Sequence, residues 1–223
     1  MDIKNKSKFI EYFSKGTKSL NNLKIGVEHE RFLFEGENKN RISYETLKKL
    51  FENLKVNGWE PRYEKGNIIG MQRNKQQITT EPGLQCELSG APLENIHQVC
   101  SESSKFLKEI ETASKSLDVN TVSIGFDPFN SLSDIPQSPK SRYKIMTKEM
   151  PKGGKQSLEM MYRTCGIQIN YDYTSEENFE KIFRLGNYLT PLTIALYSNS
   201  PFESGQPVGY YSYRNKVWQN TSR

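Results

Sequence analysis

The chain has 223 residues, which is enough for one domain with a buried core or for a large piece of a bigger domain. Its net charge of +5 arises from 31 Lys and Arg residues scattered among 26 acidic ones, without a basic block that could follow a phosphate backbone, so we expect no nucleic-acid partner. No apolar run approaches the roughly 20 residues needed to cross a bilayer, so we also expect no membrane partner.

The first predicted elements are a helix, a strand and a second helix. Residues 4–15 have the spacing of a short amphipathic helix, and residues 23–34 alternate like a strand that ends in large aromatic residues. Residues 43–56 carry apolar side chains at helical spacing. Ser43 is the expected N-cap of this helix, and Gly58 is expected to end it.

The middle of the chain predicts strands joined by tight turns. Residues 59–73 and 76–89 are expected to be strands, with turn residues at 65–66, 74–75 and 82–83. The rest of the chain is expected to contain these elements in order: a long helix over 93–117, a strand over 119–126, a proline-rich loop over 127–141, a short helix over 142–150, a strand over 158–173, a helix over 176–199 interrupted near Pro191, a loop over 201–212 and the start of another element over 213–219.

This order of elements favours an α+β fold. Short turns between strands favour antiparallel pairing, and strict alternation of strands and helices is absent. We therefore expect helices packed on one side of an antiparallel sheet. The final residues, VWQNTSR, read like the interior of a domain, so we expect a domain truncated at its C-terminus.

Glutamates recur within two strand-like segments. Glu28 and Glu30 lie two positions apart and so share one face of the first predicted strand. A solvated strand face is the simplest interpretation of this pair alone. Glu81 and Glu87 add two more carboxylates in an otherwise uncharged stretch. Four carboxylates gathered together would repel one another unless a cation neutralised them, and Mg²⁺ prefers such oxygen ligands.

Other candidate residues are ambiguous from the residues alone. Gln168 belongs to a row of polar residues along one face of its predicted strand, and this row either satisfies itself or lines a polar site. Arg142 and Arg214 lie in low-charge surroundings, where an arginine either pairs with a structural carboxylate or binds an anionic substrate. The structural role is the more common of the two.

The three cysteines, Cys86, Cys100 and Cys165, form no CxxC pair and no even disulfide framework. The charged first residues do not have the pattern of a secretory signal. Both features predict a reduced, cytoplasmic protein. The cysteines lack a histidine at recognisable spacing, so nucleophilic cysteine chemistry has little support.

Several stretches together resemble one family, the glutamate–cysteine ligases of the plant and alphaproteobacterial type. They run in the family's order and cover most of residues 23–219. The matching stretches are IGVEHERFLF, ITTEPGLQCELSGAPLENIHQVC, IGFDPF, IPQSPKSRYKIMTKEMPKGGKQSLEMMYRTCGIQIN and ALYSNSPFESGQPVGYYSYRNKVW. A chance match of this extent is implausible.

This resemblance implies a glutamine synthetase-like fold, with a curved antiparallel sheet whose concave face is the active site and helices on its outer face. Residues 1–223 would then be the N-terminal part of a single catalytic domain. It also implies the reaction, the first step of glutathione biosynthesis. ATP would phosphorylate the γ-carboxylate of L-glutamate, and the amine of L-cysteine would attack the γ-glutamyl phosphate.

The resemblance also implies roles for individual residues. The expected magnesium ligands are Glu28, Glu30, Glu81 and Glu87, with Gln168 as an additional polar ligand; Glu28, Glu81 and Glu87 are the expected catalytic residues. The expected contacts of the glutamate substrate are Arg142 and Arg214, with Trp218 beside them and Met160 and Cys165 along the side chain.

Three alternatives stay open. A related carboxylate–amine ligase would share the fold and the ATP chemistry but use a different amine acceptor. The chain could be an inactive fragment, because family chains continue for roughly the same length again. A non-catalytic basic binding module would also fit the charge of +5, and it would be favoured if the four glutamates diverged in space.

Overall fold

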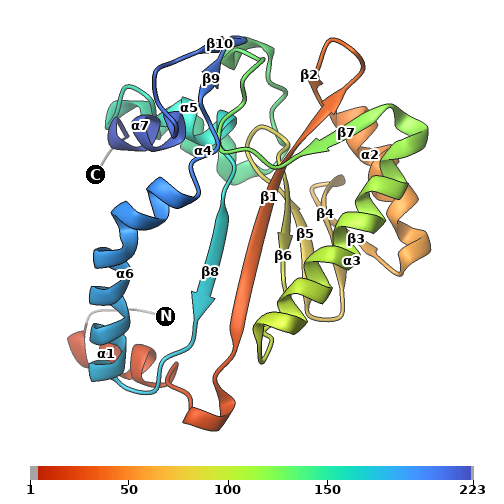
Figure 1. Ribbon diagram of the computed structural model, residues 1–223. Coiled ribbons are helices and arrows are strands. Elements are labelled where there is room, and N and C mark those ends of the chain that lie inside the picture. Colours follow the sequence, from red (N-terminus) through yellow and green to blue (C-terminus); the bar gives the residue numbers. More distant parts are fainter. Residues whose placement is uncertain (1–4, 222–223) are drawn as a thin grey trace.

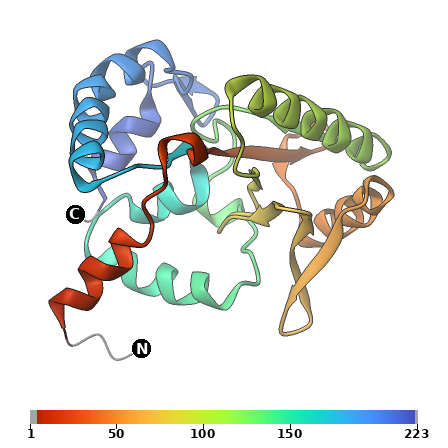
Figure 2. The same cartoon turned by 90° about the horizontal axis from the view of Figure 1, so that it is seen from below.

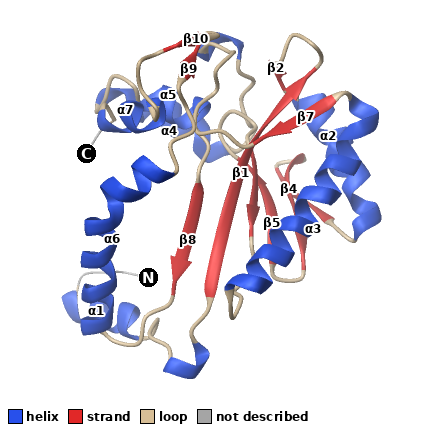
Figure 3. Ribbon diagram, viewed as in Figure 1, coloured by secondary structure: helices blue, strands red, loops and turns tan. Residues whose placement is uncertain are grey.

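The computed structural model describes residues 5–221 and shows an antiparallel sheet flanked by helices (Figures 1 and 3). The central strand is β1 (Ile25–Glu35). It pairs antiparallel with four strands, β8 (Ile167–Tyr171) and β6 (Cys86–Ser89) along its first half, and β7 (Val119–Val122) and β2 (Asn40–Arg41) along its second half. One long strand thus brings together segments that are distant in the chain.

Three further strands extend the sheet outward from β6 in the order β5 (Gln76–Thr80), β4 (Asn67–Arg73) and β3 (Glu60–Glu64). Two-residue turns join them at residues 65–66 and 74–75, where Lys65, Gly66 and Asn74 have positive φ. Such turns match the twist of the strands that they connect. A longer loop, residues 81–85, connects β5 to β6.

The register places polar residues from neighbouring strands side by side on one face of the sheet. Glu30 lies opposite Glu87, and Glu87 lies opposite Thr79 on the next strand. Glu28 lies opposite Gln168 on the other edge of β1. Because side chains alternate along a strand, all of these residues project from the same face.

The opposite face is apolar and holds the main core. It is covered by α2 (Tyr44–Leu54) and α3 (Ile96–Ser114). The buried side chains are Leu33, Met71, Ile78 and Leu88 from the strands and Leu47, Leu50, Phe51, Leu54, Phe106 and Ile110 from the helices. Figure 2 shows α3 on one side of β1 and the α4–α5 segment on the other.

Local sequence explains the limits of α2. The Ser43 hydroxyl accepts a hydrogen bond from the Thr46 amide at 3.1 Å, which satisfies one of the free amides at the start of the helix. A short 3₁₀ turn, Lys55–Asn57, follows the helix, and Gly58 then takes φ 80°. A left-handed residue at this position favours glycine because glycine has no Cβ.

On the polar side of the sheet lie α4 (Ser141–Glu149), α5 (Ser157–Arg163) and α7 (Tyr213–Gln219). A second apolar cluster, centred on Ile135 and Met161, packs α4 and α5 together. The remaining short elements are the hairpin strands β9 (Phe202–Glu203) and β10 (Gln206–Pro207) and the 3₁₀ turns Leu20–Asn22, Lys115–Leu117, Leu132–Asp134 and Met150–Lys152.

Two helices lie at the periphery. α1 (Lys6–Ser14) and α6 (Glu176–Leu196) bury none of their residues, and α6 stands beside the edge strand β8 in Figure 1. Within residues 5–221, neither these helices nor any other has the length and apolarity required to span a bilayer.

The predicted mixture of helices with a mostly antiparallel sheet is confirmed. The strands around the two-residue turns, the capped helix α2 and the helix α3 are also confirmed. Position 4, the expected start of the first helix, lies outside the described residues.

Three predicted elements were wrong in part. Residues 158–163, expected to be strand, belong to α5, because Leu158, Met161 and Tyr162 recur at helical spacing and pack into the second apolar cluster. The strand expected over 119–126 ends at Val122. Pro191 lies inside α6 without ending it.

A fully buried ion pair connects the strands to the loops behind the polar face. Arg41 Nη1 lies 3.3 Å from Asp127 Oδ2, and both side chains have no exposed surface. Arg41 also donates to the carbonyl oxygens of Tyr162, at 3.1 Å, and Gly83. Asp127 accepts from the amides of Phe129 and Asn130. One charged pair therefore links four separate segments.

We expect Asp127→Asn to lower the free energy of unfolding by roughly 3–5 kcal/mol, because it leaves the buried charge of Arg41 without a counter-ion. Urea unfolding followed by fluorescence measures the change. Glu94→Gln is the matched control, since it removes an exposed carboxylate that pairs with Lys24, and it should leave the urea midpoint unchanged. Equal midpoints for the two variants would contradict the structural role of the buried pair.

Candidate active site

Three carboxylates from two adjoining strands and the loop between β5 and β6 meet on the polar face. One oxygen atom from each of Glu30, Glu81 and Glu87 lies within 4.8 Å of the others. Glu30 and Glu87 are direct cross-strand partners, and Glu81 follows Thr79 by two positions just beyond the end of β5. The Thr79 hydroxyl lies 3.4 Å from both Glu81 and Glu87. We call Glu30, Glu81 and Glu87 the acidic trio.

The trio is electrostatically strained. Burial, followed by the charge of Glu81, raises the pKa of Glu30 to about 7, although the amide of Gly166 donates to its carboxylate at 2.5 Å. Burial and the nearby Glu87 also raise the pKa of Glu81. Both shifts have the direction expected where like charges share a partly desolvated site. A bound cation would remove this penalty.

Glu28 and Gln168 lie beside the trio rather than within it. Glu28 Oε1 accepts hydrogen bonds from Gln168 Nε2 at 3.2 Å and from Asn170 Nδ2 at 3.0 Å. The four predicted acids therefore share one face, but the oxygens of only three of them converge. The row of amides on β8 pairs with Glu28.

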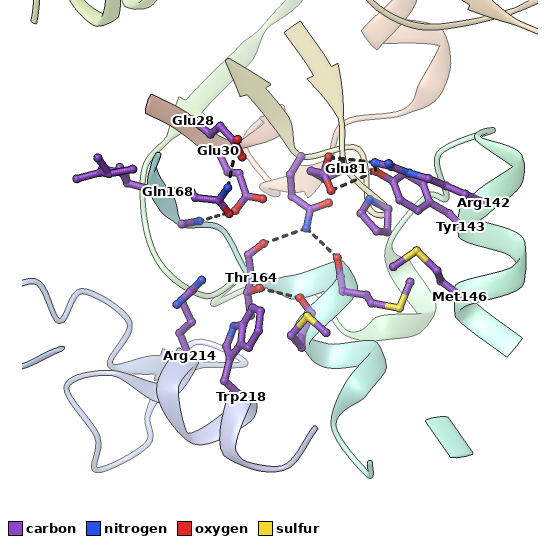
Figure 4. A pocket seen from close by; sticks show the side chains of 17 residues that line it. Glu28, Glu30, Glu81, Arg142, Tyr143, Met146, Thr164, Gln168, Arg214 and Trp218 are labelled. Carbon is purple, nitrogen blue, oxygen red and sulfur yellow. Dashed lines mark hydrogen bonds and ion pairs between the residues drawn. The ribbon is translucent and has the colours of Figure 1, made fainter. Parts of the chain in front are cut away.

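The trio borders a cavity of about 640 Å³ between the sheet and helices α4, α5 and α7 (Figure 4). Arg142 lies on the Glu81 side, where its Nη2 atom is 4.0 Å from Glu81 Oε1. Arg214 lies on the other side, and its guanidinium is 5.2 Å from the centre of the Trp218 ring. The cavity thus presents carboxylates on the sheet and two arginines on opposite walls.

Arg214 has no ion pair within 4.0 Å among the described residues, and its Nε atom is buried without a hydrogen-bond partner. Its position depends on Gly166. A Cβ atom added to Gly166 would lie 2.8 Å from Arg214 Nη2, which is closer than such atoms approach. The backbone of Gly166 therefore separates Arg214 from Glu30, and an anionic ligand could use the unpaired guanidinium.

The apolar wall of the cavity is rich in methionine. Met146, Met160 and Met161 line it together with Trp218. Cys165, which we expected along the same wall, is only 2% exposed and packs against Phe32 and Phe34. This corrects the expectation, because the side chain points into the apolar cluster beneath the sheet and is absent from the cavity lining.

Sequence reasoning missed two residues beside the trio. Tyr143 is buried, and its hydroxyl lies 3.1 Å from both Glu81 carboxylate oxygens. Lys140 is also buried; burial lowers its pKa, and the charge of Glu81 opposes this shift. Their only signal in the sequence is a lysine and an aromatic residue flanking Arg142, and this signal does not predict a contact with Glu81.

The arrangement fits a divalent cation. Carboxylate oxygens are the ligands that Mg²⁺ prefers, and raised carboxyl pKa values indicate uncompensated negative charge. The two arginines and Lys140 provide positive charge for anionic groups next to such a cation.

A model of the family described as Glutamate-cysteine ligase family 2 (GCS2) matches residues 24–223. The chain is 41% identical over 217 residues to the chloroplastic glutamate–cysteine ligase A of Oryza sativa subsp. japonica, a match that covers 97% of this chain and 44% of the rice protein. It is 42% identical over 217 residues to the chloroplastic glutamate–cysteine ligase of Nicotiana tabacum, covering 97% of this chain and 42% of the tobacco protein. The chain thus spans less than half the length of these relatives.

The names of these relatives contradict the predicted cytoplasmic location, because each is called chloroplastic. That prediction was wrong in its reasoning. Unpaired cysteines indicate a reducing environment, and such an environment is not confined to the cytoplasm.

The raised pKa of Glu30 predicts how the stability of the metal-free chain depends on pH. Folded Glu30 holds its proton up to about pH 7, whereas an unperturbed glutamate releases its proton near pH 4.5. The folded state therefore binds more protons across this window, and its stability falls as pH rises through the window. We expect Glu30→Gln to flatten this fall. Urea unfolding in the presence of a chelator measures the change, and parallel pH profiles for the two proteins would contradict it.

Proposed function

The chain belongs to glutamate–cysteine ligase family 2, and we propose that it carries the metal-binding and glutamate-binding surfaces of an ATP-dependent ligase. The reaction joins the γ-carboxylate of L-glutamate to the amine of L-cysteine through a γ-glutamyl phosphate, as the first step of glutathione biosynthesis. The observation that carries this proposal is the acidic trio, whose oxygens converge within 4.8 Å beside a cavity with an arginine on each side.

We assign magnesium to the acidic trio, with Glu28 and Gln168 beside it. When bound, the ion would neutralise charge on the phosphate oxygens of ATP as the phosphoryl group is transferred. Glu30, Glu81 and Glu87 would fix the position of the ion relative to the cavity. Ser89 supports this role, since its hydroxyl donates to Glu87 Oε1 at 2.5 Å and orients that carboxylate.

We assign the glutamate substrate to the wall opposite the trio. Arg214 offers an unpaired guanidinium for a carboxylate, and Trp218 packs against that guanidinium. Arg142 offers a second cation at the other end of the cavity, and Met160 supplies apolar surface for the methylene groups. Catalysis in this arrangement comes from positioning the carboxylate and the amine and from neutralising charge.

The mechanism needs no nucleophile from the protein. Burial raises the pKa of the Cys86 thiol to about 12 and also raises that of Cys165, so neither forms a thiolate near neutral pH. Cys100 is exposed on α3, away from the polar face. Direct transfer of the phosphoryl group from ATP to the substrate is consistent with these positions.

We further propose that residues 1–223 are part of a single glutamine synthetase-like catalytic domain. Two features support this: the sheet is antiparallel, and its two faces are specialised. One face bears the carboxylates, and α2 and α3 cover the other. A sheet of this kind keeps its acidic face open to a nucleotide while its apolar face forms the core.

The metal assignment predicts that the chain binds Mn²⁺, a spectroscopic probe for Mg²⁺, and that Glu87→Gln weakens this binding by at least about 10-fold. This is the lower end of the loss that follows mutation of an outer-shell partner of a metal. Electron paramagnetic resonance of free Mn²⁺ measures the affinity. Glu111→Gln is the matched control, because Glu111 is an exposed residue of α3 on the opposite side of the sheet. Equal affinities for the two variants would refute the assignment.

The acceptor amine is tested by turnover in the protein that contains this chain. With ATP, L-glutamate and Mg²⁺, we expect phosphate release to be faster with L-cysteine than with glycine, L-serine or L-alanine. A faster rate with another amine would favour a related carboxylate–amine ligase, whereas phosphate release without any amine would refute ligation as the function.

A further inference from the structure

A tyrosine hydroxyl connects Arg142 to the acidic trio. Arg142 Nη2 donates to the Tyr143 hydroxyl at 2.7 Å, and that hydroxyl lies 3.1 Å from both carboxylate oxygens of Glu81. The Thr80 carbonyl, at 3.2 Å, is a further acceptor. A tyrosine hydroxyl can accept one hydrogen bond while it donates another. It therefore links a cation that faces the cavity to a carboxylate of the trio.

The hydroxyl fixes a contact that the charges alone would not hold. The Arg142 side chain is 64% exposed, and its 4.0 Å distance to Glu81 is at the limit of an ion pair. Exposed pairs of this kind contribute little, because ordering the long side chain offsets the attraction. Tyr143, by contrast, is 2% exposed and fixed, and its ring also lies 4.7 Å from the guanidinium. Tyr143 thus keeps Arg142 near the trio.

We propose that Tyr143 is a positioning residue that couples the binding of an anionic substrate at Arg142 to the binding of a divalent cation at Glu81. This inference rests on the proposed function, which assigns the cation to the trio and a substrate anion to the arginines. It adds a role for Tyr143 and a sign for the coupling.

The sign of the coupling follows from the charges. Without substrate, the guanidinium of Arg142 competes with an incoming cation for the Glu81 carboxylate, because both attract the same oxygens. An anion bound to the outer edge of the guanidinium neutralises part of that charge, so the cation binds more tightly. Coupling between two binding sites is reciprocal, and the cation must therefore tighten the binding of the anion by the same factor.

The experiment measures Mn²⁺ affinity with and without saturating L-glutamate. In the unmodified chain, L-glutamate should tighten Mn²⁺ binding by about 5-fold or more, the lower end of typical coupling between sites. Tyr143→Phe removes only the hydroxyl and keeps the ring that lies against Arg142. In this variant the factor should fall below about 2-fold, because Arg142 is then free to move into solvent.

Tyr162→Phe is the matched control. The Tyr162 hydroxyl is likewise on the α4–α5 side, where it lies 2.5 Å from Thr147 Oγ1, and no hydrogen bond connects it to the trio among the described residues. This variant should keep the coupling of the unmodified chain. Urea midpoints for both variants identify any loss of folding. If Tyr143→Phe does not fold, Arg142→Met replaces it: this variant should bind Mn²⁺ at least as tightly as the unmodified chain and show no coupling.

The outcomes separate this inference from the proposed function. If the unmodified chain binds Mn²⁺ and L-glutamate without coupling, or if Tyr143→Phe retains the full factor, the inference is overturned and the metal assignment stands. Weaker Mn²⁺ binding in Arg142→Met would overturn the competition between the arginine and the cation. If the unmodified chain binds no Mn²⁺, both the metal assignment and the inference fail.

Discussion

Two carboxylates face each other across the pair of strands β1 and β6, and the rest of the site is arranged around this unfavourable contact. Like charges at directly opposed positions destabilise a sheet, and Glu81 adds a third charge to the pair of Glu30 and Glu87. The sheet tolerates them because β1 is paired along both edges and its opposite face is packed into the main core. Register, and not attraction between the side chains, holds the trio together.

The loop that carries Glu81 is fixed from behind by buried polar groups. Gln85 Nε2 donates to the carbonyls of Met161 and Thr164 at 3.1 and 3.0 Å, while Arg41 reaches the carbonyls of Tyr162 and Gly83. The carbonyls at the end of a helix lack helical partners, so these bonds satisfy groups that would otherwise be costly to bury. They also join the acid-bearing loop to α5, so the distance between the trio and the methionine wall is set by the interior of the protein.

Sequence reasoning predicted those features that depend on local pattern. Alternation placed Glu28 and Glu30 on one face, and the capping residue Ser43 marked the start of α2. It could not distinguish which acids converge, because that depends on the loop after β5 and on pairing between distant strands. Cys165 was misplaced for the same reason, since its neighbours Phe32 and Phe34 are more than 130 positions away in the chain. Patterns within one segment carry no information about such contacts.

Gly166 keeps the opposite charges of the cavity from neutralising each other. Its amide donates to Glu30, and the Arg214 guanidinium lies where a Cβ atom of any other residue would be. A direct ion pair between Glu30 and Arg214 would consume both charges and leave nothing for ligands. With one peptide between them, the carboxylate stays available to a cation and the guanidinium to an anion. A metal–nucleotide and an amino-acid carboxylate need such separated charges, because each must be held beside the other without either being displaced by the protein's own groups.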